Sequence, residues 1–153
     1  MIDSTCSLHQ NEQQLIAGIE RWSKALENKD IDAMLDRCAD DIIAFDCKMP
    51  MQHKGVSSLR AMWESCLPYF PEQFKSDRHD LVLKVDGNLA FMHCLHRVVS
   101  TIDGAKHPGP WLRVTVCYEK IEGEWRVVHE HVSAPFDPET GQAVFAIEEI
   151  SKL

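Results

Sequence analysis

The spacing of the apolar residues changes near Phe74, and this change limits the folds that are open to the chain. Before it, apolar residues recur every three or four positions, as amphipathic helices require. After it, they alternate with a period of two, which predicts four strands. These strands cover residues 74–85, 89–101, 111–121 and 125–132. Helices followed by a run of antiparallel strands predict an α+β fold, with the helices packed on one face of a curved, mostly antiparallel sheet.

The first half of the chain is expected to hold three helices and one strand. Residues 1–10 look like a loose lead-in, and the first helix is predicted to begin after an N-cap at Asn11. Asp30 is predicted to cap a short second helix. The segment 39–47 is rich in strand-forming residues, and the segment 56–67 carries apolar residues at helical spacing.

The length and the net charge of the chain limit its domain organisation and the partners that it can bind. One domain is expected over residues 1–153, with a core from about 12 to 135 and a tail in which 142–150 forms either a helix or a strand. The net charge of −8 and the lack of a Lys/Arg cluster argue against nucleic acid as a partner. No apolar run approaches the ~20 residues that a membrane helix needs, so no membrane is expected. The polar N-terminus does not resemble a signal peptide, which predicts a cytoplasmic protein.

The cysteines are expected to be free thiols, most of them small core residues. None forms a C-x-x-C pair, and their spacing matches no zinc framework. No phosphate-binding glycine loop, nucleophile elbow or dinucleotide fingerprint is present either, so no cofactor is expected. The cysteines are Cys6, Cys38, Cys47, Cys66, Cys94 and Cys117.

The last two predicted strands pair in one register if a two-residue turn joins them at Glu122 and Gly123. Arg113 and Glu130 then become diagonal neighbours on one face of the sheet. Both faces hold too many large apolar residues for a face open to water, which predicts a homodimer through the sheet. The face of Arg113 and Glu130 also holds Thr115, Val128 and Val132, and the opposite face holds His129 and His131.

Four segments of the chain resemble the SnoaL-like and ketosteroid isomerase-like proteins of the nuclear transport factor 2-like superfamily. They read NKDIDAMLDRCADDIIAFD, HKG, LRAMWESC and GEWRVVHEHVSAP, and the resemblance extends from about Glu12 to Pro135. It implies a cone-shaped, cystatin-like fold in which a strongly bent sheet wraps the helices around a pocket at its open end. It also implies a homodimer.

The resemblance carries over to individual positions of the site. Asp46 ends the segment ADDIIAFD, where the ketosteroid isomerases have their general base. Trp22 and Thr115 fall at or near the two positions that donate to the oxyanion, although neither is as acidic as the family's phenol or carboxylic acid. The same placement implies that the sheet face with Arg113 and Glu130 lines the inside of the cone. The expected catalytic residues are therefore Asp46, Arg113 and Glu130, and the expected ligand contacts are Trp22, Trp63, Thr115, Val128, His131 and Val132.

These features predict a protein that binds a small, largely apolar or aromatic molecule in a cone-shaped pocket. If it is an enzyme, the expected chemistry is proton transfer next to a carbonyl, of the isomerase, cyclase or dehydratase type. The alternative is a non-catalytic binding or oligomer-assembly module that resembles the kinase association domains.

Several candidate residues also have purely structural interpretations. Asp46 can bind a loop amide at the end of its strand, and Arg113 with Glu130 can form a structural ion pair. His129 and His131 have a spacing that suits a metal, but no third ligand accompanies them. They are therefore expected to be core or interface residues, and no metal site is predicted.

Overall fold

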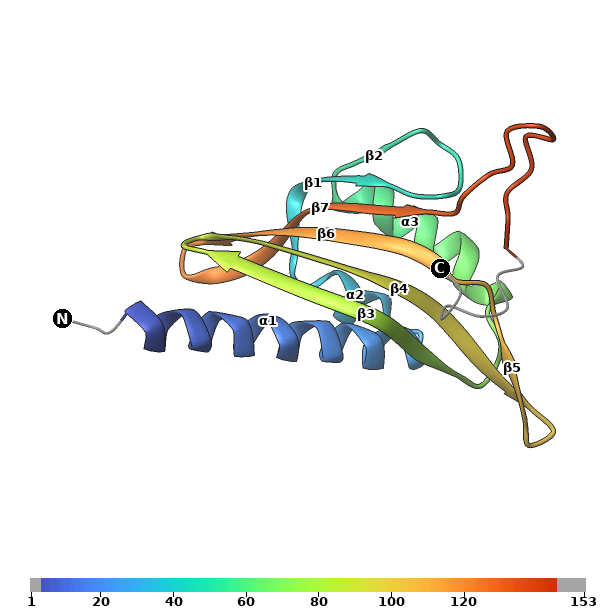
Figure 1. The fold of residues 1–153 in the computed structure, drawn as a ribbon, viewed down its shortest axis with the longest axis horizontal. Helices are drawn as coiled ribbons and strands as arrows, with labels where there is room; N and C mark the ends of the chain where they lie inside the picture. Colours follow the sequence, from blue (N-terminus) through green and yellow to red (C-terminus); the bar gives the residue numbers. More distant parts are fainter. Residues whose placement is uncertain (1–3, 146–153) are drawn as a thin grey trace.

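Seven strands form one curved sheet in the computed structural model, which describes residues 4–145 (Figure 1). The strand order is β2-β1-β7-β6-β4-β3, with β5 paired to β4, and every pairing is antiparallel except that of β1 with β7. The α+β architecture with a mostly antiparallel sheet is thereby confirmed. The elements are α1 (Ser4–Glu27), α2 (Ile31–Leu35), β1 (Cys38–Phe45), β2 (His53–Lys54), α3 (Val56–Cys66), the 3-10 turn η1 (Leu67–Tyr69), β3 (Phe74–Asp86), β4 (Leu89–Ile102), β5 (Ala105–Pro108), β6 (Leu112–Ile121) and β7 (Glu124–Ser133).

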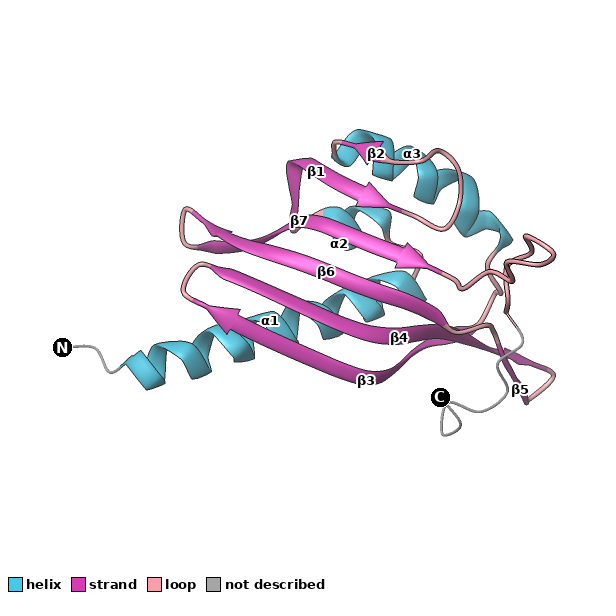
Figure 2. Cartoon of the chain, turned by 45° about the horizontal axis from the view of Figure 1, so that its top comes forward, coloured by secondary structure: helices cyan, strands magenta, loops and turns pink. Residues whose placement is uncertain are grey.

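The helices lie on the concave side of the sheet. Figure 2 shows α1 and α2 behind the strands and α3 beside β1 and β2. The short helix α2 begins at the predicted cap, since Oδ1 of Asp30 accepts a hydrogen bond from Ala33 N–H at 3.0 Å. None of the helices within residues 4–145 combines the length and the apolar character that crossing a membrane requires.

The first helix begins earlier than its apolar spacing indicates. The prediction of a loose lead-in over residues 1–10 is wrong from Ser4 onwards, because α1 already starts there. Asn11 therefore lies inside the helix rather than at its N-cap. Its side chain is buried, and its Oδ1 accepts a hydrogen bond from Lys120 Nζ at 3.0 Å. The polar first turns carry no apolar stripe, so the periodicity could not reveal them.

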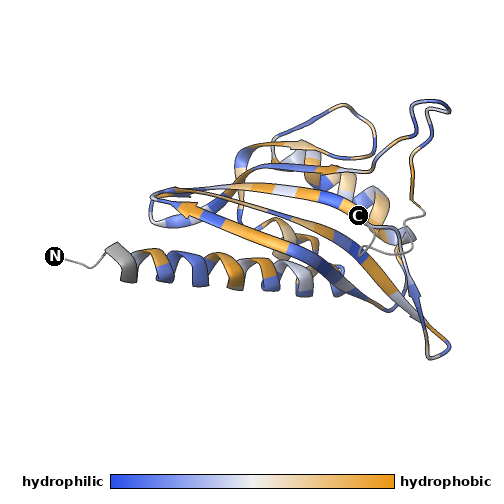
Figure 3. Ribbon diagram, in the orientation of Figure 1, coloured by the Kyte–Doolittle hydropathy of each residue, from blue (hydrophilic) through white to orange (hydrophobic). Residues whose placement is uncertain are grey.

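Two clusters of buried residues hold the helices against the sheet. One joins the end of α1 to α2, α3 and β1, and the other joins the middle of α1 to β4, β6 and β7. Figure 3 shows the alternation of hydrophobic and hydrophilic residues along α1 and the strands that produces these clusters. The largest fully buried side chains are Leu26, Ile42 and Leu59.

A bulge in the last hairpin reverses part of the predicted face assignment. Residues 118–121 pair with 124–127 as a two-residue turn requires, but Val128 has no partner in the ladder and the register then shifts by one. Beyond the bulge, a residue of β7 faces the opposite side from the one its spacing indicates. The prediction that Arg113 and Glu130 are neighbours on one face is therefore wrong: Glu130 faces the helices, and Arg113 faces outward.

Candidate functional site

The helices and the concave face of the sheet enclose one large cavity. Its volume is about 790 Å³, which lies within the range of pockets that hold small-molecule ligands. Most of its wall is apolar. Trp22 of α1 and Trp63 of α3 meet edge to face with their ring centroids 6.1 Å apart, and Met34 of α2 lies beside them. This wall suits a molecule with an extended apolar or aromatic surface.

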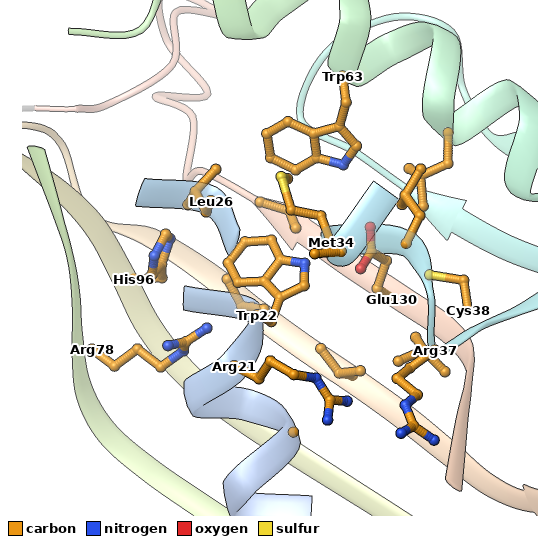
Figure 4. Close-up of a pocket in the computed structure, with 18 of the residues that line it drawn as sticks. Arg21, Trp22, Leu26, Met34, Arg37, Cys38, Trp63, Arg78, His96 and Glu130 are labelled. Atoms are coloured by element: carbon orange, nitrogen blue, oxygen red, sulfur yellow. The ribbon is translucent and has the colours of Figure 1, made fainter. Parts of the chain in front are cut away.

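The carboxyl group of Glu130 projects from β7 into this cavity, close to Met34 and Cys38 (Figure 4). Among the residues whose side chains are described, no donor forms a hydrogen bond or an ion pair with it. Removal from water, together with the negative charge of Asp46, raises the pKa of Glu130 to about 7. A carboxyl group with such a pKa can accept or donate a proton near neutral pH.

Asp46 lines the same cavity just beyond the end of β1. Its Oδ1 accepts hydrogen bonds from Lys48 N–H at 3.0 Å and from the Cys47 thiol, with an oxygen–sulfur distance of 3.6 Å. The carboxylate therefore organises the turn that follows β1, as its structural interpretation predicts. Its charge also reaches Glu130, so Asp46 has an electrostatic effect in the cavity as well.

A second polar group of the cavity, Arg78, comes from β3. Its Nη1 donates a hydrogen bond to Ser23 Oγ, and its guanidinium lies 5.5 Å from the ring centroid of Trp22. Burial lowers the pKa of Arg78, but an arginine side chain stays protonated in proteins. Among the described residues, no carboxylate lies within 4 Å of it. The cavity thus holds a cation without a counter-ion.

His96 of β4 lies next to Arg78. Its Nε2 is 2.7 Å from Ser76 Oγ, and its ring meets Trp22 edge to face at 6.0 Å. Burial, followed by the charge of Arg78, lowers the pKa of His96 to about 4. The imidazole is therefore neutral at pH 7 and can take part in hydrogen bonds without adding charge to the site.

The structure brings about half of the predicted site residues together. Those that line the cavity are Trp22, Asp46, Trp63, Glu130 and Val132. Those that do not are Arg113, Thr115, Val128 and His131. The bulge at Val128 explains the difference, because it leaves Arg113 and Thr115 on the outer face with His131.

Arg78 and His96 are among the polar residues of the cavity that were not predicted from the sequence. The alternation of side chains along the strands could have predicted that both face inward. Arg78 lies on the same face of its strand as Phe74, and His96 lies on the same face as Met92. A charged or titratable residue at an inward position of a strand is unusual enough to mark a site.

The histidine pair of β7 lies on the outer face of the sheet. Phe45 meets His129 and His131 edge to face, and His129 Nδ1 lies 2.7 Å from the carbonyl oxygen of Ile43. Within residues 7–145, whose side chains are described, no group of three or more potential metal ligands converges at a point. The cysteines whose side chains are described, all but Cys6, are free thiols.

The sequence profile of the SnoaL-like domain matches residues 16–137. Among proteins of curated function, none matches the chain. A solved NTF2-like protein of unknown function from Pseudomonas putida KT2440 is 35% identical, with 95% of this chain and 99% of that chain covered and a TM-score of 0.80.

Two more distant solved structures share the fold. An NTF2-like protein from Streptomyces avermitilis, named as a candidate dehydratase, is 13% identical over 82% of this chain and 97% of its own, with a TM-score of 0.68. The association domain of the kinase CaMKII from C. elegans is 15% identical over 83% of this chain and 98% of its own, with a TM-score of 0.67. The predicted nuclear transport factor 2-like fold is confirmed, and the chain belongs to the SnoaL-like domain family.

Proposed function

We propose that the protein is a proton-transfer enzyme that binds a small, largely apolar carbonyl compound in its cavity. The observation that carries this proposal is the isolated carboxyl group of Glu130, which faces an apolar cavity without a partner among the described residues. A buried carboxylate that served only the fold would normally be paired or hydrogen-bonded, because desolvation is otherwise too unfavourable. A general acid–base instead needs a free carboxyl group with a pKa near 7.

The expected reaction begins with Glu130 in its carboxylate form. It takes a proton from the carbon next to the carbonyl, and the electron pair of the broken C–H bond moves into the carbonyl group to form an enolate. The resulting carboxylic acid then returns the proton. In a ketone with a neighbouring C=C bond, return of the proton to the far end of the conjugated enolate is an isomerisation. In a β-hydroxy ketone, the enolate electrons form a C=C bond as the C–O bond breaks, and return of the proton to the departing hydroxyl group, which leaves as water, is a dehydration.

The enolate oxygen needs a hydrogen-bond donor or a positive charge nearby. In Figure 4 the indole nitrogen of Trp22 points towards the side of the cavity on which Glu130 lies, so its N–H is our candidate donor. Arg78 adds a positive charge to the same cavity. Thr115, which the resemblance suggested for this role, and Arg113, which was expected to be catalytic, lie on the outer face and are not part of this proposal.

Deuterium exchange tests the proposal without knowledge of the natural substrate. Bicyclic ketones such as 2-tetralone are incubated with the protein in D₂O, and NMR follows the loss of the proton next to the carbonyl. We expect exchange faster than in buffer alone, and a loss of about 10²-fold or more in the Glu130→Gln variant. Glu64→Gln is the matched control, because Glu64 is an exposed residue of α3 outside the cavity. Full activity in Glu130→Gln contradicts the proposal.

The outer face of the sheet supports a second part of the proposal, a homodimer through this face. Leu89 and Phe91 of β4 are 61% and 45% exposed, and the Phe91 ring stacks on His93 at 6.4 Å. Val82 of β3 lies on the neighbouring strand and is also exposed. Such a patch favours association with a second copy. In an assembly module, the same face would instead build a larger oligomer without catalysis, and light scattering separates the two.

A further inference from the structure

We propose that the ligand of the cavity is a carboxylic acid whose carboxylate binds to Arg78. This inference deepens the proposed function, because it gives the chemical class of the molecule on which Glu130 would act. It rests on the use of the cavity as a ligand site, and not on the catalytic step itself. The observations behind it concern the charge, the fixation and the surroundings of Arg78.

The first observation is that Arg78 has no acidic partner although the chain is rich in acids. Acidic residues outnumber Lys and Arg by 24 to 16, and four other arginines form ion pairs with carboxylates. Arg78 is withdrawn from bulk water and, among the residues whose side chains are described, it is bound only to neutral groups. A desolvated cation without a counter-ion is unfavourable for the fold, so its retention points to an anion that arrives with the ligand.

The second observation is that the guanidinium is held in place before any ligand binds. The hydrogen bond to Ser23 Oγ and the contact with the Trp22 ring come from two consecutive residues of α1, and together they fix the side chain. The planar guanidinium keeps further N–H donors for a ligand, and a pair of them matches the two oxygens of a carboxylate. Pre-organisation of this kind lowers the entropy that binding would otherwise lose.

The third observation is the order of groups across the cavity. His96 and Arg78 lie on one side of the Trp22 indole, and Glu130 lies on the other (Figure 4). A ligand can thus place its carboxylate at Arg78, rest an apolar ring against Trp22, and present a reactive carbon to Glu130. A ligand that makes these three contacts is an aromatic or alicyclic keto acid. The neutral His96 adds no second positive charge beside Arg78.

A matched pair of probes tests this inference by isothermal titration calorimetry at pH 6.5. 2-Naphthoate and 2-naphthamide share one bicyclic ring system and differ in charge. We expect the wild-type protein to bind 2-naphthoate at least about tenfold more tightly than 2-naphthamide. Arg78→Met should lose this preference, and Arg78→Lys should keep part of it, because lysine retains the charge but not the paired donors.

Two controls separate the loss of the charge from the loss of the fold. Arg60→Met removes an arginine of α3 that pairs with Asp32 at the surface, and it should keep the full preference. Unchanged binding of 2-naphthamide by Arg78→Met shows that the cavity is intact. If Arg78→Met no longer binds 2-naphthamide, Arg78→Lys is compared with the wild-type protein instead, since both carry the charge. A weaker preference for 2-naphthoate in Arg78→Lys then supports paired donors at Arg78, and an unchanged preference contradicts them.

Three results would overturn the inference: equal affinity of the wild-type protein for both probes, a preference that survives in Arg78→Met, or no binding of either probe. The proposed function fails separately. A preference for 2-naphthoate together with full deuterium exchange in Glu130→Gln would support the carboxylate site at Arg78 but refute the catalytic role of Glu130. Deuterium exchange that depends on Glu130, without a preference for 2-naphthoate, would support the catalytic role of Glu130 and refute the carboxylate site at Arg78.

Discussion

Arg78 of β3 and Glu130 of β7 face the same cavity from opposite sides of the Trp22 indole, and they form no ion pair with each other (Figure 4). Two opposite charges in one apolar cavity would stabilise each other if they met. Their separation leaves the cation available to an anionic group and the carboxyl group available to a proton.

Glu130→Gln should make the protein more stable at alkaline pH. The pKa of Glu130 is about 7 in the folded protein and near 4.5 in the unfolded chain, so folding disfavours the carboxylate. The contribution of Glu130 to the free energy of unfolding is fully present below pH 4.5 and is lost as the pH rises through 7. The neutral amide avoids that loss, so the variant should gain on the order of 2 kcal/mol in the free energy of unfolding at pH 8.

Urea unfolding of both proteins at pH 4.5 and at pH 8 measures this difference. The two proteins should differ little at pH 4.5, where Glu130 is protonated in the folded state. A difference of the same size at both pH values would show that the amide acts through packing and not through charge.

Asp46→Asn should lower the pKa of Glu130 without removing its function. Asp46 is the second cause of the raised pKa, and burial is the larger one, so the pKa should fall only part of the way towards 4.5. The amide oxygen can still accept the hydrogen bond from Lys48 N–H, which keeps the turn after β1.

The pH dependence of deuterium exchange reports this shift. In Asp46→Asn the acid limb of the profile should move to lower pH while the maximal rate stays within about tenfold of wild type. If Asp46→Asn abolishes exchange and Glu130→Gln retains it, the base is Asp46, as the family resemblance alone implies.

Most of the fold could be predicted from the sequence, because periodicity reports which side of each element is buried. The bulge at Val128 could not, since no residue there requires it, and the strand pattern reads equally well in either register. This single shift moved Arg113 out of the site and separated it from Glu130. Asp46 and Trp22 lie before the bulge in the chain, and both line the cavity.

Arg78 shows a different limit of sequence reasoning. Its inward position follows from the alternation in β3, but its significance depends on the absence of an acid near it among the described residues. Which side chains meet across a cavity depends on how the helices pack on the sheet. That packing is a property of the folded chain and not of the spacing within one strand.

Asp30→Ala should destabilise the protein by about 0.5–2 kcal/mol, because it removes the N-cap of α2. The helix carries the buried residues Met34 and Leu35, and both line the cavity. The free energy of unfolding in urea measures the loss. Asp30→Asn keeps an oxygen that can accept from Ala33 N–H and should remain close to wild type. An equal loss in both variants would contradict a role in capping.

Phe91→Asp should convert the proposed homodimer into monomers, because it places a charge in the centre of the exposed patch of β4. Ile16→Asp is the matched control, since Ile16 of α1 is exposed to the same extent, 45%, on a different element. Gel filtration with light scattering gives the mass of each variant. A wild-type protein that is monomeric, or a dimer that survives Phe91→Asp, would contradict the proposed interface.

The most direct test of the account is the pKa of Glu130 itself. In protein labelled with ¹³C at the glutamate side-chain carboxyl, NMR follows each resonance with pH, and the signal missing from Glu130→Gln identifies the residue. The account predicts a midpoint near 7. A midpoint near 4.5, the ordinary value for glutamate, would show a carboxylate that stays ionised at neutral pH and would contradict the role of Glu130 in moving a proton.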